Sequence, residues 1–345
     1  MSEREVESVT VASSARLHFG FYNFLSDNVA WGGAGIAIDN PKVIVRVYKS
    51  YEFKVENKTN IDVSDVVNKV VEGLGIRDVI IEIVDVYTRH VGLGLTTQLA
   101  LSLGYAISLL YDLGLDVRQV AYRVGRGRFS GIGVASFELG GFIIDSGRVV
   151  SQNGFVPPPS TVDDIPYAIY RQRVPRGWIF NIFIVKNAKN CGLGEHSEKV
   201  LENPRQIPKD VQIELYKTVL HYILPAIAKK DFNVFAAGLQ KFQKLVVDAF
   251  EKFFDVSINC EETDHVINLL SKYGLKSVGK SVWGPTVYGL YEYSYRKCVK
   301  ISNIVAKELE ERGYSIEKYV THPKITGASI TVVRSRKTKT WKLIA

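Results

Sequence analysis

The stretch His90–Tyr111, HVGLGLTTQLALSLGYAISLLY, determines how we interpret the rest of the chain. It follows the strand-like run Val79–Val86 and places two glycines, Gly92 and Gly94, ahead of an apolar helix. Glycine allows the backbone to approach a ligand closely, and the first N–H groups of a helix have no partner within the helix. Together with the positive end of the helix dipole, these groups predict an anion site, most often for phosphate.

A purely structural interpretation of the same stretch is also open. In that case the glycines only make the turn from strand to helix, and Thr96 or Thr97 caps the helix. Short glycine motifs occur in many chains without any ligand. The choice between the two interpretations therefore depends on what accompanies this stretch elsewhere.

Length and composition set broad limits. A chain of 345 residues predicts about two domains, and 46% hydrophobic with 23% charged residues is typical of a globular protein. Met1–Ser8 is charged and polar, so no secretory signal is expected, and polar residues interrupt the apolar run after Val91, which favours a buried helix over a membrane span. Cys191, Cys260 and Cys298 are far apart and odd in number, so we expect neither a disulfide framework nor a zinc site, and a cytoplasmic protein.

The formal net charge of +8 indicates a preference for anionic partners. Basic residues are dispersed, except in Arg123–Arg128 and in the tail Arg334–Lys342. We expect the tail to be a solvated end, because chain termini are usually loosely held. No nucleic-acid-binding motif accompanies it, so we expect no nucleic acid partner, although binding through the tail stays an alternative.

Two further segments place charged residues beside glycines. Arg16 and His18 lie two residues apart at the end of a first strand, so they point to the same face and suit an anionic substrate, although a structural role at the strand end is equally open. In the glycine-rich segment Gly125–Gly141, Arg126 and Arg128 offer guanidinium groups that bind phosphate or carboxylate through two hydrogen bonds. The alternative for this segment is a solvated loop.

A composition change marks the middle of the chain. The proline-marked connection Pro157–Asp164 precedes a new apolar strand, Trp178–Val185, and we place a domain boundary near Gln172. The second half then contains helices within Asp210–Phe254 and Glu261–Tyr273, two strands within Lys276–Tyr291, the helix Tyr293–Arg312, and strands Tyr314–Val320 and Lys324–Val333. That order is typical of a split βαβ sandwich. We expect domains at 1–172 and 173–345.

Four segments carry a resemblance to a known family. They are Arg16–Gly20 (RLHFG), Gly92–Gln98 (GLGLTTQ), Gly127–Ala135 (GRFSGIGVA) and Ser281–Tyr288 (SVWGPTVY). In this order they resemble the superfamily of galactokinase, homoserine kinase and mevalonate kinase (the GHMP kinases), and more closely its β-ribofuranosylaminobenzene 5′-phosphate synthases. The resemblance spans nearly the whole chain. It implies an α+β, two-domain GHMP-kinase-like fold, with an N-terminal ribosomal-S5-like domain 2 and a C-terminal ferredoxin-like domain, and a homodimer.

The resemblance also implies a reaction. Synthases of this family join phosphoribosyl pyrophosphate to the ring of a 4-substituted benzoate (4-aminobenzoate or 4-hydroxybenzoate) and release carbon dioxide and pyrophosphate. The reaction belongs to the biosynthesis of methanopterin-type cofactors in archaea. Mg²⁺ is expected on the pyrophosphate, because a cation neutralises the charge of the leaving group. No organic cofactor and no membrane partner are implied.

Roles for particular residues follow from the resemblance and from residue chemistry. His18 and His90 are expected to position the leaving group or the aromatic ring, and Glu195 or Glu198 to stabilise an oxocarbenium-like ribose. Thr96 is the expected metal contact. The expected substrate-binding residues are Arg16, Gly92, Gly94, Thr96, Thr97, Arg126, Arg128, Ser130, Ser281, Gly284 and Thr286.

Two positions depart from the kinase pattern. The kinases carry two serines after Gly-Leu-Gly, whereas Leu95 and Thr96 stand here, so the hydroxyl for the metal is lost or shifted by one residue. Leu95 also departs from the serine expected in the synthases. The kinases commonly carry an aspartate after Ser-Gly-x, where this chain has Gly133. Phosphoryl transfer can still proceed by positioning and charge, but this change argues against a kinase. An ATP-dependent small-molecule kinase and a non-enzymatic binding protein stay as alternatives.

Overall fold

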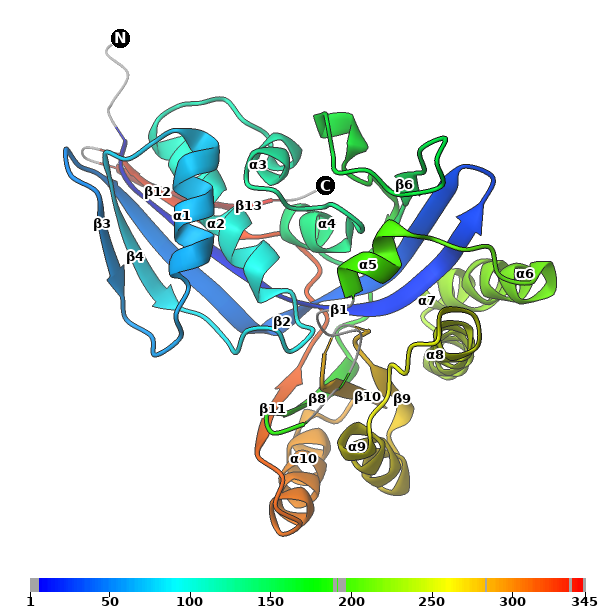
Figure 1. The fold of residues 1–345 in the computed structure, drawn as a ribbon. Coiled ribbons are helices and arrows are strands. Elements are labelled where there is room, and N and C mark those ends of the chain that lie inside the picture. Colours follow the sequence, from blue (N-terminus) through cyan, green and yellow to red (C-terminus); the bar gives the residue numbers. More distant parts are fainter. Residues whose placement is uncertain (1–5, 189–190, 192–196, 283, 335–336, 344–345) are drawn as a thin grey trace.

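The computed structural model describes residues 6–188, 191, 197–282, 284–334 and 337–343, and two β-sheets organise them (Figure 1). The strands are β1 (Val6–Ser26), β2 (Val29–Lys49), β3 (Lys54–Asn57), β4 (Val79–Asp85), β5 (Phe142–Asp145), β6 (Arg148–Val149), β7 (Ala168–Gln172), β8 (Trp178–Val185), β9 (Lys276–Lys280), β10 (Thr286–Glu292), β11 (Ile316–Thr321), β12 (Ser329–Arg334) and β13 (Lys337–Lys342). The helices are α1 (Ser64–Leu74), α2 (Leu95–Leu110), α3 (Val117–Arg123), α4 (Ile132–Glu138), α5 (Ser197–Glu202), α6 (Lys209–Lys217), α7 (Leu224–Lys229), α8 (Phe232–Phe254), α9 (Glu261–Lys272) and α10 (Tyr295–Glu310), with the 3-10 helix η1 (Val162–Asp164) and the π-helix η3 (Thr218–Ile223).

The long antiparallel hairpin β1–β2 is the centre of the larger sheet, whose strand order is β13-β12-β1-β2-β4-β3. Many of its buried positions are β-branched; Val11, for example, lies opposite Val45, and both are fully buried. We expected the first strand to end at Arg16–Gly20, but β1 continues to Ser26 through irregular pairings at these residues. Bulges bend a strand without ending it and redirect its side chains, which is why polar residues appear there.

Helices α1 to α4 lie together over one side of this sheet (Figure 1). Helix α2 packs against β1 and β2 on one side and against α1, α3 and α4 on the other. Its apolar residues therefore find buried neighbours in nearly every direction, as a helix without a polar face requires. The apolar run was correctly predicted as a buried helix.

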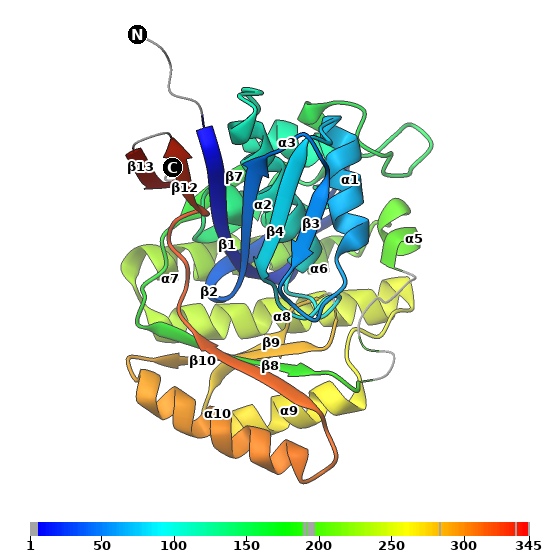
Figure 2. The same ribbon diagram turned by 90° about the vertical axis from the view of Figure 1, so that its left-hand side faces the viewer.

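The smaller sheet has the order β11-β8-β10-β9, and every neighbouring pair is antiparallel. Helices α9 and α10 pack against it, and α8 runs between the two sheets (Figure 2). Numbered within this unit, the strand order is 4-1-3-2 with a helix after the first and third strands, which is the ferredoxin-like arrangement. The predicted split βαβ sandwich is present.

Aromatic packing joins the larger sheet to α8. Phe21, Phe24 and Trp31 from the β1–β2 hairpin contact Phe250 and Phe254 of α8. The rings of Trp31 and Phe250 are nearly parallel, with an interplanar angle of 2° and centroids 6.3 Å apart. Because large aromatic side chains bury much apolar area each, this cluster stabilises the junction between the two halves.

The end of the chain differs from the prediction. β12 pairs with β1, and β13 pairs with β12, so both strands extend the larger sheet. We expected residues 173–345 to form the second domain and the tail to be a solvated end. Ile330 and Val332 are instead buried against the first sheet, whereas Arg334 and Lys342 of the tail are exposed, although β13 pairs with β12. One cut near Gln172 therefore does not separate the two sheets along the sequence.

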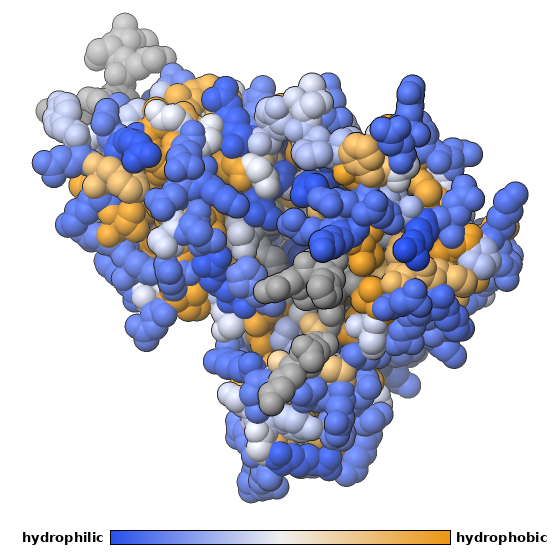
Figure 3. Space-filling view, in the orientation of Figure 1, coloured by the Kyte–Doolittle hydropathy of each residue, from blue (hydrophilic) through white to orange (hydrophobic). Residues whose placement is uncertain are grey.

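Among the described residues, no helix combines the length and apolarity needed to cross a bilayer. Hydrophilic residues cover most of the face shown in Figure 3, with apolar residues in smaller patches between them.

Candidate active site

The connection from β4 to α2 forms a tight turn directly before the helix. His90, Gly92 and Gly94 all have positive φ, at 58°, 92° and 81°. The N–H of Gln98 donates to the carbonyl of Gly94 at 3.0 Å, and this is the first hydrogen bond of α2. The N–H groups before it have no partner within the helix, which is the geometry of an anion site at a helix N-terminus.

This turn borders a cavity of 760 Å³. The cavity is lined by Arg16, Thr88, His90, Val91, Gly92, Leu93, Gly94, Leu95, Thr96, Thr97, Arg126, Cys191, Glu198 and Gly284. Two arginines and one histidine face a single carboxylate among these residues, so positive charge predominates. A cavity of this size and charge suits an anionic small molecule.

Arg16 lies partly buried against the turn. Its Nη1 donates to the carbonyl of Gly92 at 2.5 Å, and its backbone N–H donates to the carbonyl of Leu93 at 3.1 Å. Burial lowers the pKa of Arg16 to about 10, so the side chain stays charged at neutral pH. A Cβ atom at Gly94 would lie 3.2 Å from Cζ of Arg16. Glycine at this position therefore allows the positive φ and also leaves room for the close approach of Arg16.

The loop between β9 and β10 holds the turn from the other side. Ser281 Oγ donates to the carbonyl of Gly92 at 2.7 Å, and Thr286 Oγ1 donates to the carbonyl of Val91 at 2.5 Å. A Cβ at Gly284 would lie 2.9 Å from the nitrogen of Gly92, so this glycine packs against the turn. We expected all three residues to bind substrate. Only Gly284 lines the cavity, whereas Ser281 and Thr286 are buried and position the turn.

Hydrogen bonds join three polar side chains near Arg16, of which His18 and Asp145 are buried and Ser130 is partly buried. The N–H of Gly20 donates to His18 Nδ1 at 3.2 Å, so the proton of the neutral ring is on Nε2. His18 Nε2 then donates to Ser130 Oγ at 3.1 Å, and Ser130 Oγ donates to Asp145 Oδ2 at 2.8 Å. Asp145 also accepts the backbone N–H groups of three glycines, Gly33, Gly131 and Gly147.

Burial determines the electrostatics of His18 and Asp145. Burial, and secondly the charge of Arg16, lowers the pKa of His18 well below its ordinary value. Burial raises the pKa of Asp145, while its hydrogen bonds oppose that change. His18 and Ser130 were expected at the substrate, yet neither lines the cavity. Asp145 was missed altogether, and its only signal was an acid as the last residue of the buried strand β5.

The two arginines of the glycine-rich segment have different surroundings. Arg126 lines the cavity, and burial lowers its pKa while the charge of Glu198 opposes that change. Arg128 lies outside this cavity: its Nη2 is 2.5 Å from Glu202 Oε1, and its Nη1 is 3.6 Å from Glu198 Oε2. The expected role of Arg128 in binding substrate is therefore not supported, because its guanidinium is engaged by α5. Glu195, the other predicted carboxylate, lies outside the described residues.

Gly133 lies at the place of the expected kinase aspartate, on α4 against α2. A Cβ there would be 3.0 Å from Cγ2 of Thr97. The Gly133 carbonyl accepts Gln98 Nε2–H at 2.9 Å. An aspartate would therefore crowd the Thr97 side chain, which would have to shift by a small amount.

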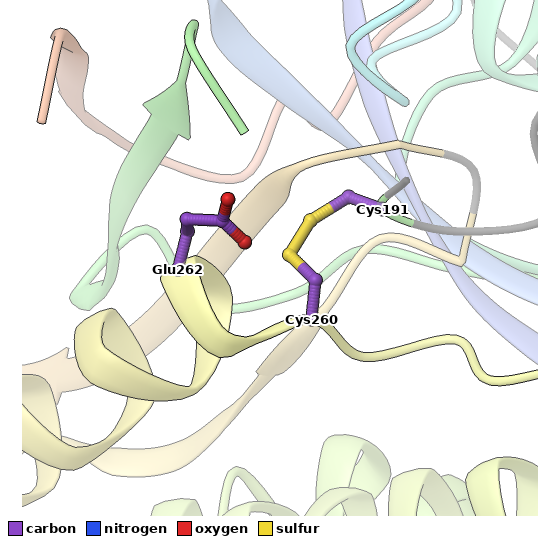
Figure 4. A group of neighbouring side chains, drawn as sticks. All are labelled: Cys191, Cys260 and Glu262. Atoms are coloured by element: carbon purple, nitrogen blue, oxygen red, sulfur yellow. A yellow bond between two sulfur atoms is a disulfide. The ribbon is translucent and has the colours of Figure 1, made fainter. Parts of the chain in front are cut away.

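Cys191, on the cavity wall, forms a disulfide with Cys260 at the start of α9 (Figure 4). Their Cα atoms are 5.2 Å apart although 69 residues separate them. The carboxylate of Glu262 lies beside the pair, within 4.8 Å of both sulfur atoms. We expected no disulfide from the spacing in sequence. That expectation was wrong, because the fold brings the two distant cysteines together.

Comparison with solved structures defines the class of protein. The chain superposes on homoserine kinase from Cytophaga hutchinsonii with a TM-score of 0.65, 18% identity, and coverage of 96% of this chain and 99% of that one. Mevalonate diphosphate decarboxylase from Staphylococcus aureus gives a TM-score of 0.63 at 13% identity, over 95% of this chain and 98% of the other. Phosphomevalonate kinase from Streptococcus pneumoniae also gives 0.63, at 12% identity over 92% and 100%. The chain has the two-domain fold of the GHMP kinases, as predicted.

Sequence comparison is more specific. The chain is 28% identical to β-ribofuranosylphenol 5′-phosphate synthase of Archaeoglobus fulgidus, over 87% of this chain and 92% of that protein. It is 26% identical to proteins of the same name from Methanothermobacter thermautotrophicus (75% of this chain, 81% of the other) and Methanocaldococcus jannaschii (81% and 88%). No family model matches the chain. The predicted resemblance to a synthase of this kind is confirmed, with relatives named for the phenol rather than the aminobenzene product, and the fold is that of the GHMP kinases.

Proposed function

We propose that this chain transfers the phosphoribosyl group of phosphoribosyl pyrophosphate to 4-hydroxybenzoate, with release of carbon dioxide and pyrophosphate. The bond between ribose C1 and pyrophosphate breaks, and a bond from C1 to the carboxylated ring carbon forms. The bond from the ring to the carboxylate then breaks, and its electron pair restores the aromatic ring. The product is a β-ribofuranosylphenol 5′-phosphate, an intermediate for methanopterin-type cofactors.

The observation that carries this proposal is similarity over most of the chain to three archaeal proteins named for that product. The word phenol in those names favours 4-hydroxybenzoate over 4-aminobenzoate. The cavity agrees in its chemistry, since phosphoribosyl pyrophosphate and a benzoate are both anions and positive charge predominates on its wall. Support therefore comes from two independent sources, similarity and electrostatics.

In this proposal, the pyrophosphate lies at the N-terminus of α2. The free N–H groups there donate to its oxygens, and Arg16 supplies a partly buried positive charge against the turn. Arg126 is the second cation of the cavity and receives the ribose phosphate or the benzoate carboxylate. His90 stays a candidate for positioning the leaving group, because it lines the same cavity.

Magnesium is part of the proposal. Mg²⁺ prefers oxygen ligands and is usually held by substrate phosphates, water and one or two protein groups. The Thr96 hydroxyl and the Glu198 carboxylate are the oxygen donors that fit this need on the cavity wall. Bound there, the ion would neutralise charge on the departing pyrophosphate. Glu198 is the carboxylate among the described lining residues, so it also stays the candidate for stabilising an oxocarbenium-like ribose.

His18 takes a different role from the one first expected. Because its ring is buried and neutral and bonded to Ser130, we propose that it positions Arg16 and the strand β1 rather than the substrate. Its backbone supports this, since His18 N–H donates to Ser281 Oγ at 3.1 Å. His18 thereby links the bulged strand to the loop that holds the turn through its backbone N–H, and to β5 through Ser130 and Asp145.

An ATP-dependent kinase on the same fold is the alternative. The similar solved structures include kinases, but their sequence identity to this chain is only 12–18%. Identity this low supports a shared fold and not a shared reaction. Gly133 offers no carboxylate for a kinase and is closely packed against Thr97. We therefore place this alternative second. We further propose a homodimer in an archaeal cytoplasm, since the relatives are archaeal proteins, with no nucleic acid partner.

The test uses purified protein, Mg²⁺, phosphoribosyl pyrophosphate and 4-hydroxybenzoate labelled in its carboxyl carbon. We expect labelled carbon dioxide and pyrophosphate in equal amounts, and a slower reaction with 4-aminobenzoate. A sample without benzoate measures hydrolysis of phosphoribosyl pyrophosphate alone. Pyrophosphate release without carbon dioxide, or ADP formation from ATP with homoserine, mevalonate or galactose, would contradict the proposal.

A further inference from the structure

A second cavity, of 530 Å³, lies where the chain passes between the two sheets. Its walls come from β2, the segment before β8, α10, and the connection from β11 to β12. Figure 2 shows that connection descending beside the chain that leads from β7 to β8. None of the described residues lines both this cavity and the active-site cavity.

Backbone hydrogen bonds hold these walls in place. The N–H of Asp39 donates to the carbonyl of His322 at 2.9 Å, and the N–H of Lys324 donates to the carbonyl of Ala37 at 2.9 Å. His322 Nδ1 donates to the carbonyl of Arg176 at 2.7 Å, which fixes the imidazole ring. Tyr295 stacks on that ring with centroids 5.3 Å apart and an interplanar angle of 17°. The cavity is therefore formed before any ligand arrives.

Positive charge in this cavity is not balanced. Lys42, Arg176, Lys324 and Lys342 line it together with one carboxylate, Asp39. That carboxylate is already paired with Arg176, at 2.9 Å between Nη2 and Oδ2. None of the three lysines forms an ion pair of this kind among the described residues; Lys42 and Lys342 are exposed to water, whereas Lys324 is not.

Lys324 shows the imbalance most clearly. Its side chain is largely buried, and burial lowers its pKa. The charge of Asp39 opposes this change, and the charges of Lys42, Lys342 and Arg176 add to it. A buried lysine among like charges is unfavourable without an anion nearby, since burial removes the water that would solvate the ammonium group. The arrangement is typical of a site that is completed by an anionic ligand.

We propose that this cavity binds an oligophosphate, such as pyrophosphate or the diphosphate of a nucleotide, at a site separate from the active site. The cavity of 530 Å³ is lined by several separate positive charges, which is more than one small anion would contact. A ligand with two or more phosphate groups matches this number of charges better. The proposal does not depend on the reaction proposed above, because the two cavities have no described lining residue in common.

The test is calorimetric titration with pyrophosphate at constant ionic strength. Two variants separate the sites: Lys324→Met removes the buried cation here, and Gly94→Ala disturbs the turn before α2. Lys69→Met is the matched control, since it removes the same charge from an exposed position on α1. We expect Lys324→Met to weaken second-site binding at least tenfold, whereas Gly94→Ala and Lys69→Met retain it within about twofold.

The folding of Lys324→Met is checked by its melting temperature, which we expect to be unchanged or raised in the absence of ligand because repulsion is removed. Lys42→Met, at an exposed part of the same wall, is expected to weaken binding about threefold and guards against misfolding of the first variant. Sulfate is expected to bind at least tenfold more weakly than pyrophosphate. Wild-type affinity in Lys324→Met, an equal loss in Lys69→Met, or equal affinity for sulfate each overturns the proposal.

Discussion

Replacing Gly94 by alanine tests the anion site most directly. The φ angle at this residue is 81°, and an added Cβ would lie 3.2 Å from Nε and Cζ of Arg16. The positive φ alone costs about 1–2 kcal/mol for a residue with a Cβ. Displacing Arg16, or blocking one N–H group from the pyrophosphate, removes a charged hydrogen bond worth about 1.5–3 kcal/mol.

These magnitudes predict separate changes in stability and in binding. The loss of one charged hydrogen bond corresponds to roughly a 10- to 150-fold weaker affinity for phosphoribosyl pyrophosphate. The benzoate contacts other groups, so its affinity is expected to change less than threefold. The strain at Gly94 lowers the melting temperature by only a few degrees, about 2–4 °C per kcal/mol in a domain of ordinary size.

Gly114→Ala is a matched control. Its φ is 64°, and nothing lies within 4 Å of an added Cβ, so this variant has the backbone strain without any contact to the cavity. Calorimetry with each ligand and a thermal melt of both variants decide the question. If Gly94→Ala loses both ligands in parallel with a large drop in melting temperature, Gly94 serves only the turn. Unchanged binding of phosphoribosyl pyrophosphate would refute the anion site itself.

Three further predictions address the surroundings of the site. His18 has a pKa well below 6.5 in the folded chain, so the unfolded chain binds a proton that the folded one does not. The contribution of neutral His18 to the free energy of unfolding is therefore fully present above pH 6.5. It declines as the pH falls below that value, by up to about 1.4 kcal/mol per pH unit. Melting from pH 7.5 to 5.0 is expected to show a shallower decline in His18→Asn than in the wild type, whereas the exposed control His221→Asn keeps the wild-type slope; equal slopes in all three proteins contradict this. Reduction of the disulfide, or Cys260→Ser, is expected to lower the free energy of unfolding by roughly 4 kcal/mol, because a long loop loses its restraint. Denaturation with and without a reductant measures this effect. Cys298→Ser, which changes the buried free thiol, is the control. An equal free energy of unfolding with and without the reductant would show that the bond does not form. Arg128→Lys is expected to change kcat/KM less than threefold and to lower stability by about 1 kcal/mol or less, since its partners are on α5. A large loss of kcat in that variant would return Arg128 to the active site.

The fold was predictable from sequence where the signal is local. Glycines before an apolar helix indicate the turn at Gly92 and Gly94 whatever surrounds them, and the strand and helix order of the second half follows from periodicity. One cavity beside this turn is lined by Arg16, His90 and Arg126, which were predicted from separate segments. Their roles in binding or catalysis stay predictions.

The remainder depended on contacts that no short segment specifies. Ser281 and Thr286 belong to a segment that carries the family resemblance, but only the packing of β10 shows that they hold carbonyls of the turn. Arg128 differs from Arg126 by two residues and faces α5 rather than the cavity, because the loop between them turns at Gly127, with φ of 81°. Asp145 has no motif of its own, and its importance lies in the four groups that donate to it.

The pairing of β1 with β12 has a consequence for how the protein is made. Val9 lies opposite Val332, so the outer neighbour of β1 is synthesised 323 residues after it (332 minus 9). At about 5–20 residues per second, roughly 15–65 s separate the two strands as they leave the ribosome. During that interval one edge of the largest sheet presents unpaired backbone groups to other nascent chains. Premature termination shortly before Ser329 would leave that edge open permanently, and aggregation rather than simple loss of activity is the expected fate of the truncated product.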